Sequence, residues 1–119
     1  MDTKLTPQEV HTLKRIRHVV EQTKPSQWTT GDEHTDDGQR HCFLGHMENH
    51  GLRSQWTKIE SKLEEAQIED KWKYPFDVTD VNDAQKGEHV AKMFRQKTPR
   101  GRCTAYLRKV FRFFGLEAR

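Results

Sequence analysis

Long hydrophobic runs are absent from this chain, and aliphatic residues are scarce. Leu, Ile, Val and Phe together number 23 of 119 residues, close to the roughly 20% below which highly charged chains are disordered. Disorder also requires a high net charge, whereas the formal net charge here is only +3. Three Trp and six Phe supply large side chains for burial. We therefore expect a single folded domain over residues 1–119 with a thin core.

Cysteine is also scarce, and no segment has the character of a leader or a membrane span. Two cysteines far apart in the sequence indicate reduced thiols rather than a disulfide framework. The first residues contain no hydrophobic signal-peptide core. No apolar run approaches the roughly 20 residues that cross a bilayer. These absences predict a cytoplasmic protein that has no membrane partner.

Charge is abundant, at 33% of residues, and it is unevenly distributed along the chain. Residues 1–91 contain 12 Lys and Arg against 17 Asp and Glu, a net charge of −5. Residues 92–119 contain 9 against 1, a net charge of +8. A basic C-terminal quarter on an acidic body is typical of proteins that bind nucleic acid or another polyanion. Two alternatives stay open: docking of this segment on the acidic body, and an ordinary solvated helix face.

Hydrophobic periodicity predicts a mostly α fold of about five short helices. Thr6–Glu9 has the pattern of a capping box with Pro at the first helical position. A helix over about 54–67 would present Trp56, Ile59, Leu63 and Ala66 on one face. Asn82–Gln85 resembles another capped helix start. The last and most basic helix is expected over residues 99–115.

The segment before residue 42 is polar and contains a turn signal at Asp37–Gly38. A small β-hairpin near residues 27–41 is therefore left open, with strands near Gln27–Thr29 and Gln39–His41. The flanking residues are too polar for the pattern to require it.

A cluster of Cys and His residues lies around a short helix expected from about Cys42 to Asn49. Cys42, His46 and His50 are spaced by four residues and would share one side of that helix, with His34 upstream. Zinc takes about four such ligands, but Cys42 and His50 would lie roughly 12 Å apart along the axis. One ion can therefore use at most two of the three.

Packing is the alternative explanation of the same cluster. Cys42 would then be a small buried side chain, Gly45 would permit close helix packing, and His46 and His50 would lie at the rim. We favour this interpretation and expect no cofactor, with zinc bound by Cys42, His46, His50 or His34 as the alternative.

A nucleophilic role for Cys42 is a further alternative. A thiol at a helix N-terminus has a lowered pKa, and His41 or His46 could act as its base. No pattern in the sequence indicates an oxyanion hole or a third catalytic group. We therefore assign no catalytic residue and favour a protein that is not an enzyme.

The basic C-terminal segment carries the residues that we expect to contact a partner. Tyr106 and Phe111 are interleaved with these cations and could stack on bases, as aromatic residues do in single-strand binders. The partner would be a nucleic acid or an acidic protein surface, and the sequence does not indicate an oligomeric state. The candidate contact residues are Arg95, Lys97, Arg100, Arg102, Arg108, Lys109 and Arg112.

The spacing of Trp28, Gly31 and Gly38, then Cys42–Gly45, then Asn82–Asp83, resembles a family of small bacterial and phage domains of uncharacterised function. The resemblance covers about residues 10–90. It implies that Cys42 and Gly45 are structural and that Asn82–Asp83 caps a helix, and it transfers no catalytic role.

The chain departs from that family at three places. His46 stands where the family usually has Ala, Val81 stands where it often has an aromatic residue, and the basic tail has no counterpart.

The sequence thus predicts a small non-enzymatic binding or regulatory protein that acts through its basic C-terminal helix. The resemblance leaves a phage origin open, in which case the location would be the host cytoplasm. The alternative is a zinc domain or small hydrolase centred on Cys42 and His46.

Overall fold

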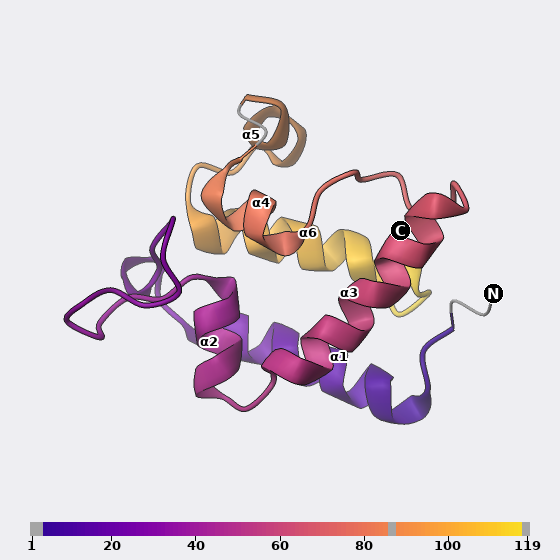
Figure 1. The fold of residues 1–119 in the computed structure, drawn as a ribbon, viewed down its shortest axis with the longest axis horizontal. Coiled ribbons are helices and arrows are strands. Elements are labelled where there is room, and N and C mark those ends of the chain that lie inside the picture. Colours follow the sequence, from indigo (N-terminus) through magenta and orange to yellow (C-terminus); the bar gives the residue numbers. More distant parts are fainter. Residues whose placement is uncertain (1–3, 86–87, 118–119) are drawn as a thin grey trace.

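The computed structural model of the protein describes residues 4–85 and 88–117 (Figure 1). Helices dominate this part of the chain, which contains no extended β-strand, so the predicted mostly α fold is confirmed. The elements are α1 (Pro7–Gln22), the 3₁₀ turn η1 (Pro25–Gln27), α2 (Phe43–Asn49), α3 (Arg53–Ile68), α4 (Val78–Asp83), α5 (Glu88–Phe94) and α6 (Pro99–Phe113). No helix in the described residues is long and apolar enough to cross a membrane.

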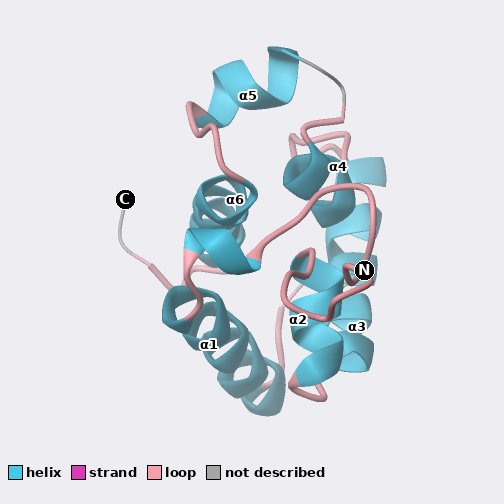
Figure 2. Ribbon diagram, turned by 90° about the vertical axis from the view of Figure 1, so that its left-hand side faces the viewer, coloured by secondary structure: helices cyan, strands magenta, loops and turns pink. Residues whose placement is uncertain are grey.

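The helices form two sides around one core. In Figure 2, α1 and α6 lie on one side and α2, α3 and α4 on the other. α1 contacts α2, α3 and α6, and the short α4 packs extensively on α6. α5 sits at one end of the molecule, where it touches α6. The connector between α3 and α4 therefore passes close to α6, an arrangement that matters for the site.

The core is built from the apolar faces that periodicity predicts. Trp56, Ile59, Leu63 and Ala66 are the buried residues of α3, as expected. The buried core residues of the two long helices on the other side, apart from the polar Arg102, are Leu13, Ile16 and Val20 of α1 and Cys103, Tyr106, Leu107, Val110 and Phe111 of α6.

The start of α1 also follows its sequence pattern. The Thr6 hydroxyl accepts a hydrogen bond from the Glu9 amide at 3.1 Å, and the Glu9 carboxylate accepts one from the Thr6 amide at 2.8 Å. Lys62 of α3 also donates to Glu9 at 2.7 Å. The cap thus joins α1 to α3 as well as starting the helix.

The helix start predicted at Asn82 is wrong. α4 begins at Val78, and Asp77 and Asp80 form its capping box. Asn82 lies in the last turn of α4 and is buried. Two overlapping patterns competed here, and the earlier one prevails because it lets Val78 and Val81 bury their side chains.

The hairpin left open near residues 27–41 does not form as expected. His41 instead makes two isolated bridges, one parallel to Trp28 and one antiparallel to His34. The turn at Gly38 is present, with the Gly38 amide donating to Thr35 O at 2.9 Å. This turn closes the loop between residues 33 and 42. The antiparallel partner of His41 is therefore His34 and not a residue near Gln27–Thr29.

Candidate functional site

Arg102, predicted to contact a partner, is mostly buried and its guanidinium is used inside the protein, although it also lines a surface hollow with Arg95 and Lys97. Only 5% of the residue is exposed. Its Nε donates to Val81 O at 2.8 Å, and its Nη2 donates to Asn82 O at 2.7 Å. Nη1 donates to Lys97 O at 2.9 Å. The carbonyls at the end of a helix have few amide donors, and among the described backbone amides only that of Ala84 donates to Val81 O, at 3.3 Å. Arg102 gives Val81 O and Asn82 O a charged donor each, so its role is structural.

Asn82 extends this polar junction from α4 to α2 and to the loop after η1. Its Oδ1 accepts a hydrogen bond from the Phe43 amide at the start of α2, at 3.0 Å. Its Nδ2 donates to Thr29 O at 3.0 Å and to Asp83 Oδ1 at 2.7 Å. Because both ends of the amide are used, Asn82 ties α4 to α2 and to the loop after η1.

The other cations that were predicted to contact a partner lie at different places in the structure. Arg100 donates to Glu21 O at 3.2 Å, and Arg108 lies 3.8 Å from Glu117. Arg95 and Lys97, together with Lys92, surround an exposed hollow near the start of α6. Within the described residues, no cation of residues 92–117 forms an ion pair with an acidic residue of residues 4–91. The docking alternative therefore has no ionic contact to support it there.

Lys109 and Arg112 help to form a basic hollow, defined here as the hollow that they share with Lys71 and Lys73 and with three aromatic residues. Its volume is about 250 Å³. The two lysines come from the connector between α3 and α4, which passes beside α6 (Figure 1). Lys71 lies 3.4 Å from Glu69.

Three aromatic residues line the basic hollow: Trp72, Tyr74 and Phe113. The Trp72 ring lies 4.8 Å from the Tyr74 ring and 5.2 Å from the Phe113 ring. Tyr74 and Phe113 are half-buried, whereas Trp72 is 5% exposed. The hollow thus combines cations with the edges of a packed aromatic cluster.

The aromatic residues predicted to stack on bases are not at this surface. Tyr106 is 1% exposed and Phe111 is fully buried. The sequence missed Lys71 and Lys73, although their alternation with Trp72 and Tyr74 is the kind of basic and aromatic interleaving that was sought.

The histidine cluster contains His34, His41 and His46. The His34 and His41 Nδ1 atoms lie 2.7 Å apart, and the His41 ring meets the His46 ring edge to face at 5.0 Å. His46 is 5% exposed, so its predicted place at the rim is wrong, whereas His50 is exposed. Trp28 covers His46, with ring centroids 4.5 Å apart.

His46 is held in its neutral form. Its Nε2 lies 3.0 Å from Gln27 O and therefore donates to that carbonyl. Burial lowers the pKa of His46 to about 4, and the neighbouring His41 and His50 add to the effect. Burial, together with His34, also lowers the pKa of His41.

The metal candidates are not assembled as the sequence suggested. Among described residues, the donors that approach within 4.8 Å of one another are Glu33, His34 and Glu48. Of the four predicted candidates, only His34 belongs to this group. Arg53 occupies both carboxylates, with Nη2 at 2.6 Å from Glu33 and Nη1 at 2.8 Å from Glu48. The guanidinium already supplies the positive charge that an ion would bring.

Cys42 has a structural role at the start of α2. Its Sγ accepts from the Gly45 amide at 3.5 Å. Burial raises the pKa of the Cys42 thiol, and a protonated thiol is a poor nucleophile. The environment thus opposes the activation that a hydrolase would need.

No protein-family model, no curated protein and no solved structure matches this chain significantly. The resemblance to the small bacterial and phage domains gains no support from these comparisons and stays a prediction.

Proposed function

We propose that the protein is a non-catalytic binding protein that holds a single-stranded nucleic acid at the basic hollow. The observation that carries the proposal is the convergence of Lys71 and Lys73 with Lys109 and Arg112 around three aromatic residues. Single-strand binders combine cations that follow the backbone with aromatic surfaces on which bases stack.

The charge of the hollow is available to a partner. Lys73, Lys109 and Arg112 have no acidic partner among the described residues. Phosphate binding would release counterions at each of these cations. An acidic protein surface could use the same charges, but it would have less use for the half-buried rings of Tyr74 and Phe113.

The patch of Lys92, Arg95 and Lys97 supplies a second set of exposed cations near the other end of α6. We expect it to strengthen binding without setting the position of the bases, because the residues that line it include no aromatic side chain.

Fluorescence anisotropy with a labelled 20-nucleotide oligo(dT) tests the proposal. The variant neutralises the hollow with Lys71→Gln, Lys73→Gln, Lys109→Gln and Arg112→Gln. We expect it to bind about tenfold more weakly or worse at about 0.1 M salt, because four phosphate contacts are lost.

The matched control removes the same charge elsewhere, with Lys14→Gln, Arg15→Gln, Lys24→Gln and Lys58→Gln. These residues are exposed and do not line the hollow. Equal weakening in both variants, or no binding by the unaltered protein, would contradict the proposal. Far-UV circular dichroism verifies that both variants keep their helices.

A further inference from the structure

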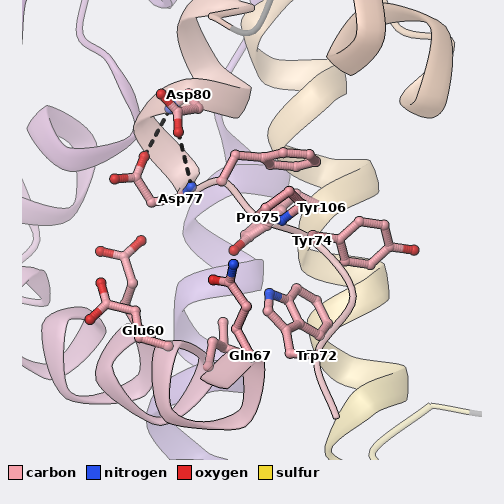
Figure 3. A pocket seen from close by; sticks show the side chains of 11 residues that line it. Glu60, Gln67, Trp72, Tyr74, Pro75, Asp77, Asp80 and Tyr106 are labelled. Carbon is pink, nitrogen blue, oxygen red and sulfur yellow. Dashed lines mark hydrogen bonds between the residues drawn. The ribbon is translucent and has the colours of Figure 1, made fainter. Parts of the chain in front are cut away.

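A second pocket adjoins the basic hollow, and its lining is acidic rather than basic (Figure 3). Its volume is about 310 Å³. Trp72 and Tyr74 line both hollows. Four carboxylates line this pocket, from Glu60 and Glu64 of α3 and from Asp77 and Asp80 at the start of α4. We call it the acidic pocket.

We propose that the acidic pocket binds an organic cation with an ammonium or guanidinium group, which pairs with Glu60 and hydrogen-bonds to Tyr106. The inference is independent of nucleic-acid binding at the basic hollow.

Two polar groups at the ends of otherwise buried side chains have no protein partner among the described residues. Tyr106 is 1% exposed and Trp72 is 5% exposed, yet neither the hydroxyl nor the indole N–H makes a hydrogen bond there. Figure 3 shows the polar ends of both side chains directed into the pocket. The Tyr106 hydroxyl oxygen can accept a hydrogen bond from a cationic donor. It therefore marks a place where such a ligand can bind, and the indole N–H of Trp72 lies beside that place.

The carboxylates crowd one another. The Glu60 carboxylate accepts a hydrogen bond from the Val78 amide at 3.3 Å. Burial raises its pKa, and the neighbouring Asp77 and Glu64 raise it further. A bound cation would relieve both the desolvation and the repulsion.

The spacing of these groups favours an organic cation over a metal ion. Within the described residues, no three carboxylates of this pocket bring ligand atoms within 4.8 Å of one another. An ion coordinated by several oxygens needs closer ligands. A flat guanidinium or an alkylammonium spans more space, and aromatic walls attract such cations. The volume is near the lower end of ligand pockets, which suits one small group.

An NMR titration of the whole protein tests the inference, with the indole N–H signal of Trp72 as the reporter. The free-amine probe is agmatine, and the peptide probe is Gly-Arg-Gly with blocked ends. Butane-1,4-diol serves as a neutral probe. We expect saturable shifts with at least one cationic probe and none with the diol. Tighter binding of agmatine would identify a free amine as the source, and tighter binding of the peptide would identify an arginine side chain of a partner protein.

Two variants test the assigned contacts. Glu60→Gln should weaken binding about tenfold or more, the loss expected for a charge-assisted hydrogen bond. Tyr106→Phe should weaken it severalfold. Glu65→Gln is the control, since Glu65 is on the same helix and does not line the pocket. The same spectra report whether each variant is folded.

Three results would overturn the inference: no saturable shift with either cation, equal shifts with the diol, or undiminished binding by both Glu60→Gln and Tyr106→Phe. Competition by Mg²⁺ at equal concentration would also overturn it, because it would show a metal site.

Discussion

His46 is a buried histidine whose neutral form is required by its surroundings. The ring is covered by Trp28 and donates to Gln27 O. Its pKa in the folded protein is about 4, against 6.5 for the exposed group. Between pH 6.5 and 4, His46 is therefore protonated in the unfolded chain but stays neutral in the folded protein. The stability due to neutral His46 is full above pH 6.5 and is lost as the pH falls towards 4.

We expect this residue alone to remove about 3 kcal/mol of stability between pH 6.5 and 4. Urea unfolding at pH 7, 5.5 and 4 measures the loss. His46→Gln retains an N–H donor without a titratable group, so its stability should fall less steeply with pH. His50→Gln, at an exposed position, should keep the steep dependence. Identical pH profiles for the unaltered protein and His46→Gln would show that the buried imidazole does not control acid stability.

Arg102 and Arg112 are both arginines of α6 with different roles. Arg102 makes three hydrogen bonds to carbonyls, two of them buried, whereas Arg112 is exposed at the basic hollow. We expect Arg102→Met to cost about 3 kcal/mol, because three carbonyls lose a charged donor. Arg112→Gln should change stability by less than about 0.5 kcal/mol. Chemical denaturation of both variants at neutral pH measures the difference, and equal small effects would contradict the structural role of Arg102.

The sequence could not separate these two arginines. Both are charged residues of one amphipathic helix, and a periodic pattern places charged residues on the solvated side. What buries Arg102 is the end of α4, whose carbonyls arrive from a distant part of the chain. The same limit applies to His46, which is buried by Trp28 from the preceding loop rather than by its own helix.

At the scale of elements, α2 depends on a close approach to the loop before it. A Cβ added at Gly45 would overlap the carbonyl oxygen of Glu33. Cys42 donates its amide to that same oxygen at 3.1 Å. Gly45 permits a close approach, as predicted, but the segment that approaches it is the backbone of a loop and not another helix.

We expect Gly45→Ala to destabilise the protein by about 3 kcal/mol, since backbone atoms must move to admit the methyl group. Asn49→Ala, at an exposed position of the same helix, is the control and should have little effect. Thermal unfolding of the two variants measures the difference. A Gly45→Ala protein as stable as the control would show that the loop can move away at little cost.

Elements with strong local signals were predictable. The capping box predicted the start of α1, and α3 was predicted as 54–67 and observed as Arg53–Ile68. The start of α4 was missed because two capping patterns overlap between residues 77 and 85. Local chemistry permits both, and only packing against α6 selects between them.

At the scale of the whole molecule, two hollows of opposite charge adjoin along the connector between α3 and α4, where Trp72 and Tyr74 line both. Lys71 and Lys73 face the basic side with Lys109 and Arg112, while Glu60 belongs to the acidic side. The sequence predicted the basic character of α6 but not this arrangement. The arrangement brings together residues that are about forty positions apart in the sequence. No local sequence pattern predicts such a contact.

The dependence of binding on salt tests the proposed nucleic-acid site most directly. Four phosphate contacts at the basic hollow should contribute about −3 to the slope of the logarithm of the association constant against the logarithm of salt concentration with single-stranded DNA. The variant neutralised at Lys71, Lys73, Lys109 and Arg112 should lose this contribution and keep only the smaller slope due to Lys92, Arg95 and Lys97. A slope near zero for the unaltered protein, or the same slope for both proteins, would show that the basic hollow does not bind nucleic acid.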